Sequence, residues 1–253
     1  MPADVRVFAL SGLGEIQPGD DLVALIANAT VAAALAVDAG DVFVVTQKIV
    51  SKAEGALVEL QSVVPSGRAR SWAGEWGKDA RVIELVLQQS VRIVRMERGV
   101  IISETKHGFI CANAGVDTSN VDGRFAALLP EDPDASARTL RRGLGDRLRV
   151  PVGVVVSDTF GRPWREGQVN VAIGVAGLAP IADYRGQADT FGHRLTASAI
   201  AVADEIAAAA ELVMGKTSGI PVALVKGTGL GTGREHDGSG RALIRRAEED
   251  MFR

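Results

Sequence analysis

The sequence predicts a mixed α/β or α+β fold with mixed sheets, neither a P-loop nor a Rossmann domain. The chain has 253 residues, 47% of them apolar, which is enough to bury a substantial core. Strand and helix patterns occur without the strict βαβ alternation of a doubly wound sheet, and no internal repeat is present. We expect one domain over residues 1–240, undivided or as two interlocked lobes, and a tail or domain junction over residues 241–253.

The first half of the chain mixes strand and helix patterns. Residues 5–10, VRVFAL, predict a strand. Residues 19–37 predict a helix with acidic residues at its positive end. The β-branched run in residues 40–55 predicts a buried strand, and residues 68–90 predict helical pieces.

The second half continues the mixture. Residues 91–115 alternate like paired strands, and an Asp-Pro-Asp entry predicts a helix over residues 132–148. The stretch VPVGVVVS, residues 150–157, is mostly valine and predicts a strand buried on both faces. An alanine-rich helix over residues 196–214 and a β-branched strand over residues 220–225 complete the predicted elements.

The triplet Gly215-Lys216-Thr217 imitates the end of a P-loop. A P-loop needs a further glycine where this chain has Ala210, and it needs a strand before it and a helix after it. Here the order is helix, turn, strand, and Gly215 stands where a left-handed helix stop is expected. A true P-loop is therefore not expected.

Bulk properties favour a small-molecule partner. The formal net charge is −3 with both signs interspersed, so we expect no nucleic-acid surface. The single Cys111 cannot form an internal disulfide, and the first residues lack a signal-peptide pattern. No apolar run reaches the length of a membrane span. We expect a cytoplasmic protein without a membrane partner.

A candidate metal site follows the valine-rich strand in SDTFGRPWREG. Asp158 and Thr159 supply the hard oxygen ligands that Mg²⁺ or Mn²⁺ accepts. Arg162 and Arg165 follow, and guanidinium groups can pair with phosphate or carboxylate. The alternative is an Asp turn with solvated arginines.

A second polar loop follows the strand GFICANAG. It contains Asp117, Thr118, Ser119 and Asn120, which could join Asp158 around a metal and a phosphate, or form an Asx turn that satisfies its own backbone. Lys48 and Lys52 follow another strand. Either can neutralise a phosphate, although for isolated lysines a surface role is favoured.

Other conspicuous residues receive no catalytic role. Gly227, Gly229, Gly231 and Gly233 lack dinucleotide-fingerprint spacing, and a mobile loop is expected there. His107, His193 and His236 show no ligand spacing. Cys111 is expected in the core, and Asp204 and Glu205 on a solvated face or at a helix-packing contact.

Five blocks together resemble the coenzyme F-420 γ-glutamyl ligases: VSKAEG, HGFICANAGVDTSNV, SDTFGRPWREGQVNVAIGVAGLAP, ADEIAAAAELVMGK and IPVALVKG. They occur in the family's order between about Gly12 and Gly227. The resemblance implies that family's fold and an intertwined homodimer. It also implies a GTP-dependent ligase that adds L-glutamate to the F-420 precursor and extends a γ-linked tail through an acyl phosphate.

The resemblance also implies the site residues and cofactors. Asp117 and Asp158 would bind Mg²⁺ or Mn²⁺ and serve catalysis, with Thr159 at a second metal position; K⁺ is a further implied cofactor. Arg162 and Arg165 would contact substrate or phosphate. The implied nucleotide pocket comprises Leu13, Gly14, Glu15, Ile16, Gln47, Lys48, Lys52, Asn120, Met214, Gly215, Lys216, Thr217, Ser218 and Gly219, in a last segment that runs to Pro221.

The chain departs from the family pattern at three positions. Gly14 replaces a common proline, and Gln47 replaces a common serine. Lys216 stands where archaeal relatives carry a metal-binding glutamate; because a charged lysine cannot ligate a cation, it is expected to contact phosphate. The segment RRAEEDMFR resembles the junction to a flavin-binding domain in actinobacterial relatives, so we expect one half of a bifunctional enzyme.

Two other functions stay open at this point. The same aspartates could serve a metal-dependent phosphohydrolase that cleaves GTP without ligation. A non-enzymatic deazaflavin carrier would bind the cofactor by its polar tail and would need neither Asp117 nor Asp158.

Overall fold

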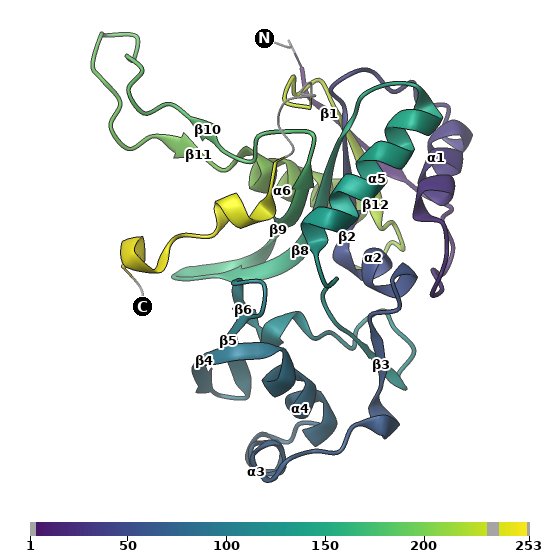
Figure 1. Cartoon of the computed structure of the whole chain (residues 1–253), viewed down its shortest axis with the longest axis vertical. Coiled ribbons are helices and arrows are strands. Elements are labelled where there is room, and N and C mark those ends of the chain that lie inside the picture. Colours follow the sequence, from purple (N-terminus) through teal and green to yellow (C-terminus); the bar gives the residue numbers. More distant parts are fainter. Residues whose placement is uncertain (1–3, 232–237, 252–253) are drawn as a thin grey trace.

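A five-stranded sheet lies at the centre of the molecule (Figure 1). The computed structural model describes residues 4–231 and 238–251. The strand order is β1 (Arg6–Leu10), β12 (Val222–Lys226), β2 (Val42–Thr46), β8 (Gly153–Arg162) and β9 (Arg165–Ala176). Only β2 and β8 pair in parallel, and the other three pairs are antiparallel. The sheet is therefore mixed, as predicted.

Helices cover both faces of this sheet (Figure 1). Helices α1 (Leu22–Ala32) and α5 (Pro133–Leu148) lie on one face, and α6 (Val202–Met214) lies on the other. Alternate residues of a strand point to opposite faces, so Val154 and Val156 join the core beneath α1 and α5 while Val155 joins the core beneath α6. The prediction of a strand buried on both faces is confirmed.

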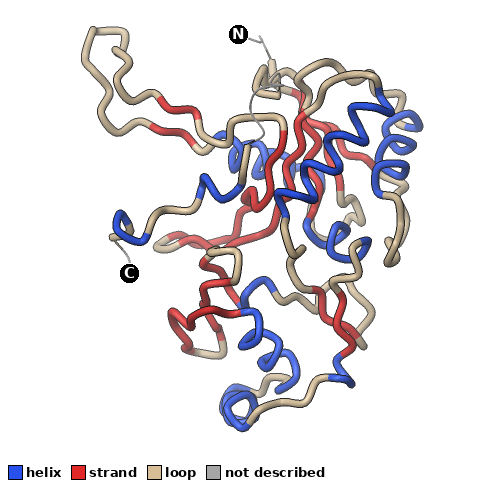
Figure 2. Tube along the Cα trace, viewed as in Figure 1, coloured by secondary structure: helices blue, strands red, loops and turns tan. Residues whose placement is uncertain are grey.

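A second region lies below the sheet in the view of Figure 2 and has its own hydrophobic core. It is built around Ile83, Val86, Ile101 and Ala126. Its elements are β3 (Leu57–Glu59), α3 (Gly67–Trp76), α4 (Ala80–Gln89), β4 (Ser90–Glu97), β5 (Val100–Thr105), β6 (Ile110–Ala112) and β7 (Phe125–Ala127). The predicted helical pieces and paired strands are confirmed here.

A narrow arm projects from the body between β10 (Ala182–Asp183) and β11 (Ala199–Ile200), which pair with each other (Figures 1 and 2). Short 3-10 helices complete the described elements: Leu60–Ser62, Asn113–Gly115, Gly240–Leu243 and Ala247–Glu249. Within residues 4–231 and 238–251, no helix is both long and apolar enough to cross a bilayer.

Several predicted boundaries are wrong. The strand predicted over residues 40–55 ends at Thr46, and Gln47–Ala53 forms helix α2. Residues four apart lie on the same side of a helix, and here Ser51 Oγ donates to Gln47 Oε1 over 2.9 Å. The strand predicted over residues 150–157 continues to Arg162, because β9 pairs with it along this extension.

The alanine-rich helix also begins later than predicted. It starts at Val202, because residues 199 and 200 pair with β10 in the arm. Gly215 ends it with φ 60° and ψ 170°, so its φ is positive but its conformation is not the predicted left-handed helical one. Strand β12 follows the turn, and the order helix, turn, strand that argued against a P-loop is confirmed.

Candidate active site

Predicted site residues from four chain segments meet at the carboxyl ends of β2 and β8. Because these strands are parallel, the segments that follow them emerge at the same edge of the sheet. Lys48 lies in the first turn of α2, directly after β2. Asp158 and Thr159 lie on β8 one and two residues beyond the Thr46–Ser157 pair. The loop after β6 contributes Asp117, and the loop after α6 contributes Lys216.

Asp117 is held by Lys48 and by its own loop. Lys48 Nζ lies 2.6 Å from Asp117 Oδ2 and donates to the Ser119 carbonyl oxygen over 2.6 Å. The Ser119 N–H donates to Asp117 Oδ1 over 2.7 Å, which is the predicted Asx turn. Burial raises the pKa of Asp117, but the hydrogen bonds from Lys48 and Ser119 outweigh it and hold that pKa below its usual value. Asp117 is therefore a stable anion.

Asp158 has the opposite electrostatic balance. Burial raises its pKa from 3.8 to about 6, and the charge of Asp117 adds to the rise. The Thr159 N–H, which donates to Asp158 Oδ1 over 2.8 Å, and the charges of Lys216 and Lys48 offset only part of this. The ionised form of Asp158 is therefore less favourable in the folded protein than in water, and a cation beside it would restore its charged state.

Thr159 joins Asp158 to the loop after α6. Lys216 Nζ donates to Thr159 Oγ1, and Thr159 Oγ1 donates to Asn170 Oδ1 over 2.6 Å. Asn170 Nδ2 in turn donates to Glu211 Oε2 over 2.8 Å. Sequence reasoning missed Asn170 and Glu211; the available signal was an asparagine inside the apolar run VNVAIGVA.

The donor set fits a hard divalent cation. Two carboxylates and a hydroxyl are oxygen ligands, and Mg²⁺ is commonly bound through one or two carboxylates with water and substrate phosphates as the remaining ligands. Among the described residues, no group of three or more His, Cys, Asp or Glu side chains could hold a metal by itself. The cluster therefore suits a metal that arrives with phosphate better than a closed structural site.

The other residues of the predicted nucleotide pocket lie in three places: in α2 and the loop that contains Glu15, after Asp117, and in the turn after α6. Lys52, at the buried end of α2, forms an ion pair with Glu15 in the loop that also contains the buried Leu13 and Ile16. Gln47 is buried and accepts from Ser51. Gly14 lies in the same loop as Glu15, and Asn120 is exposed after Asp117. Met214 is buried at the end of α6. The turn that follows is exposed and comprises Gly215, Thr217, Ser218 and Gly219; Ser218 Oγ donates to the Met214 carbonyl.

Arg162 and Arg165 are not brought into this cluster. They pair with each other in register at the tip of the β8–β9 hairpin, both exposed, and Arg162 donates to the Glu166 carbonyl over 2.8 Å. The alternative reading of solvated arginines describes their position in this chain. A substrate contact at these residues stays a prediction.

Of the residues without a catalytic role, Cys111 is buried, as predicted. Burial and the charge of Asp158 raise its pKa to about 12, so the thiol is a poor nucleophile. Asp204 accepts from the Ala172 N–H over 2.9 Å, which makes it a helix-packing contact, and Glu205 is exposed. Gly233 and His236 lie outside the described residues.

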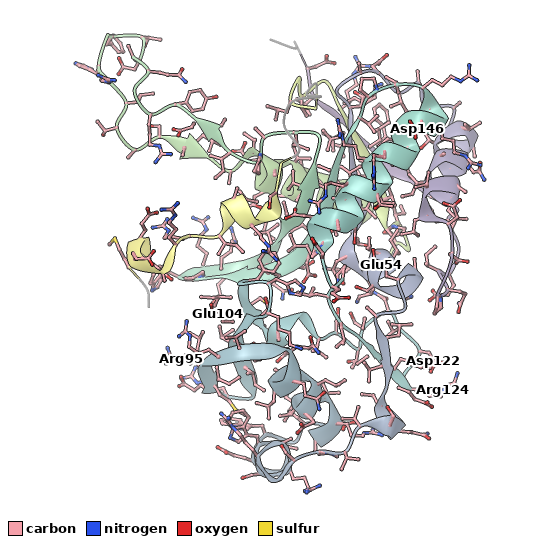
Figure 3. The ribbon with its side chains drawn as sticks, viewed as in Figure 1. Glu54, Arg95, Glu104, Asp122, Arg124 and Asp146 are labelled. Carbon is pink, nitrogen blue, oxygen red and sulfur yellow. The ribbon has the colours of Figure 1, made fainter. Side chains whose placement is uncertain are left out.

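Two cavities lie elsewhere. One of about 310 Å³ lies at the far end of the sheet beside Lys226 and Asp41. The other, of about 380 Å³, lies between α1, α2 and α5 and includes Glu54, which Figure 3 shows near the start of α5. Neither is lined by Asp117 or Asp158, which lie at the mouth of the site, the edge of the sheet where β2 and β8 end.

Comparison with known proteins gives consistent results. The family model described as F420-0:Gamma-glutamyl ligase matches residues 12–227. The chain is 43% identical over 250 residues to a coenzyme F420:L-glutamate ligase of Methanothermobacter thermautotrophicus, covering 98% of this chain and 99% of the relative. It is 44% identical over 241 residues to the ligase of the same name from Methanopyrus kandleri, covering 94% of each chain. The chain therefore belongs to the F420-0:gamma-glutamyl ligase family.

Proposed function

We propose that this protein is a GTP-dependent ligase that adds L-glutamate to the coenzyme F420 precursor and extends a γ-linked glutamate tail. The observation that carries the proposal is the cluster of Asp117, Asp158 and Thr159 with the ammonium groups of Lys48 and Lys216. Such a mouth combines anions for a divalent cation with cations for phosphate. The relatives' shared name, and their match along nearly the whole chain, support the choice of substrates.

The proposed reaction has two steps. The terminal carboxylate of the precursor attacks the γ-phosphorus of GTP, the bond to GDP breaks, and an acyl phosphate forms. The amine of L-glutamate then attacks the acyl carbon, phosphate leaves, and the amine loses its proton as the amide forms. No protein nucleophile is required, in keeping with the buried thiol of Cys111.

Each polar residue of the cluster has a proposed task. Asp117 and Asp158 would hold Mg²⁺ or Mn²⁺, with Thr159 as a further ligand, and the bound ion would offset charge on the transferring phosphoryl group. Lys48 keeps Asp117 ionised, and Lys216, on an exposed turn, would contact a phosphate. Lys52 and the loop around Glu15 would line the guanine nucleotide. K⁺ is included as a cofactor to be tested by ion replacement.

A homodimer working in the cytoplasm is also part of the proposal. The arm over residues 182–200 projects from the body (Figure 1). It exposes aromatic side chains, with Phe191 86% and Tyr184 43% accessible. Apolar groups on a projecting segment gain by burial against a second copy. Sedimentation at several protein concentrations would show a dimer; a monomer at all of them would refute this part.

Incubation with precursor, L-glutamate, GTP and Mn²⁺ tests the function, with product mass and GDP followed together. Successive glutamyl mass gains that require GTP are expected, and they should disappear in Asp117→Asn and Asp158→Asn. GTP cleavage without a mass gain would support the phosphohydrolase instead. Precursor binding without turnover, unchanged in both variants, would support the carrier.

A further inference from the structure

A directional chain of hydrogen bonds runs from the candidate site into the protein interior. It starts at Lys216 Nζ, passes through Thr159 Oγ1 and the side-chain amide of Asn170, and ends at the carboxylate of Glu211. This chain of hydrogen bonds leads from the mouth of the site across β8 and β9 to α6, the helix that covers one face of the sheet.

The chemistry of the end groups fixes the direction of every bond. A carboxylate only accepts, so the NH₂ group of Asn170 must face Glu211 and Oδ1 must face Thr159. Because Oδ1 also only accepts, Thr159 must give its one hydroxyl proton to Asn170. The lone pairs of Thr159 Oγ1 are then available only toward the mouth, where Lys216 donates to them.

Burial prevents the arrangement from relaxing. Asn170 is 2% exposed and stands opposite Thr159 in the β8–β9 register. Its neighbours Val171 and Ala172 pack into the two cores, so a buried amide at this position costs free energy unless its partners are kept. Because Asn170 has almost no access to water, a flipped amide would turn its Oδ1 toward the Glu211 carboxylate and place two acceptors face to face.

We propose that Asn170 and Glu211 are positioning residues that hold Thr159 as an obligate acceptor toward the cations of the site. The inference rests on the proposed function for the identity of those cations, which are the Lys216 ammonium and a divalent ion brought with the nucleotide. Neither residue touches substrate. Their effect is on cation and nucleotide affinity, through Thr159.

A single variant and a double variant, the second with the net charge of the wild type, test the direction of the hydrogen-bond chain. In Asn170→Asp, a carboxylate oxygen replaces the NH₂ group that faces Glu211, and repulsion between the two carboxylates displaces the acceptor for Thr159. In the double variant Asn170→Asp with Glu211→Gln, the new carboxylate accepts from Thr159 and from the glutamine amide, and the net charge of the pair is that of the wild type. Glu205→Gln is the matched control, because it is the same substitution at an exposed position of α6.

The readouts are Mn²⁺ affinity in the presence of GDP by electron paramagnetic resonance, the KM for GTP against kcat, and the melting temperature. We expect Asn170→Asp to weaken Mn²⁺ binding by about tenfold or more and to raise the KM for GTP, since hydrogen bonds to charged groups have that magnitude. The double variant should return both values to within about threefold of the wild type. The control should match the wild type.

Two results would overturn the inference: unchanged Mn²⁺ affinity and KM in Asn170→Asp, or a double variant no better than the single one at equal melting temperature. A purely structural role would move the melting temperature and not the Mn²⁺ affinity of the folded protein. Because Mn²⁺ binding is measured without ligation, a wild type that binds Mn²⁺ but makes no glutamyl product would refute the proposed function and leave this inference standing.

Discussion

Lysine and aspartate side chains gather at each end of β2, and the two clusters balance their charges differently. At the amino end, Lys226 Nζ lies 2.8 Å from Asp38 Oδ2 and 2.7 Å from Asp41 Oδ2, and it also donates to the Ala36 carbonyl over 2.6 Å. Burial lowers the pKa of Lys226, but the hydrogen bonds to both aspartates outweigh it and raise that pKa. The charges of Asp38 and Asp41 are therefore compensated inside the cluster, which we call electrostatically closed.

At the carboxyl end, one lysine hydrogen bond serves Asp117, while burial raises the pKa of Asp158 to about 6. Only five strand residues separate the ends. The difference teaches that charged residues alone do not mark a site: a closed cluster stabilises the fold, whereas an under-compensated carboxylate costs stability and is ready for a ligand cation.

The largest expected effect comes from removing the under-compensated charge. Asp158→Asn should reduce ligase turnover by about 10²- to 10³-fold, the scale for losing one electrostatic contact in a transition state. It should also raise the free energy of unfolding at pH 7 by about 2 kcal/mol, because a buried charge with a raised pKa is removed. Product mass and urea melts measure the two effects. Exposed Asp38→Asn is the control and should leave turnover unchanged. Retained turnover in Asp158→Asn would contradict the assignment.

Opening the closed cluster should have the reverse consequence. Lys226→Met leaves Asp41, which is 3% exposed, without its cation, and should lower the free energy of unfolding by about 3 kcal/mol. Turnover per folded molecule should be unaffected, because the cluster lies at the far end of β2. Adding Asp41→Asn should recover part of the loss. A lysine variant that is stable but inactive would show that the two ends are functionally coupled.

The pH dependence follows from the sign of the Asp158 shift. Its folded pKa, about 6, lies above the unfolded value of 3.8, so its contribution to stability is complete below about pH 4 and is lost as pH rises through 6. Melts of the metal-free wild type should therefore approach those of Asp158→Asn at low pH and fall below them by pH 7. The facing carboxylate of Asp117 stays ionised over most of this range, because the hydrogen bonds from Lys48 and Ser119 hold its pKa below the usual value. A difference in stability between the wild type and Asp158→Asn that does not change with pH would refute the raised pKa of Asp158.

The smallest effect is expected at Cys111. Burial and the charge of Asp158 raise its pKa to about 12, so iodoacetamide at pH 7.5 should label the folded protein very slowly and leave ligase turnover intact. Mass spectrometry before and after denaturation measures the labelling. Rapid labelling with loss of turnover would show that the mouth opens to Cys111.

Much of the fold was predictable because its strands and helices have strong local patterns. The valine run before Asp158 and the Asp-Pro-Asp entry of α5 specify their elements without help from distant residues. The failures occur where a distant partner decides. Residues 199 and 200 have helix-compatible neighbours but pair with β10, and the extension of β8 to Arg162 exists because β9 lies beside it.

The site was predictable in part for the same reason. Asp117 and Asp158 are candidates from the sequence because each follows an apolar strand and lies in a family motif. Asn170 and Glu211 were not, because their role depends on contacts across the β8–β9 register and with α6.

By itself, the sequence determined the mixed fold class, the family, and which residue types could hold a metal and phosphate, because these depend on periodicity, motif order and side-chain chemistry. Only the tertiary structure decided which charges meet. It placed Lys48 on Asp117, left Asp158 under-compensated, and closed Lys226 onto Asp38 and Asp41. The physical reason is that Coulomb energies and desolvation depend on distance and burial in the folded chain, and neither quantity is encoded by the spacing of residues along it.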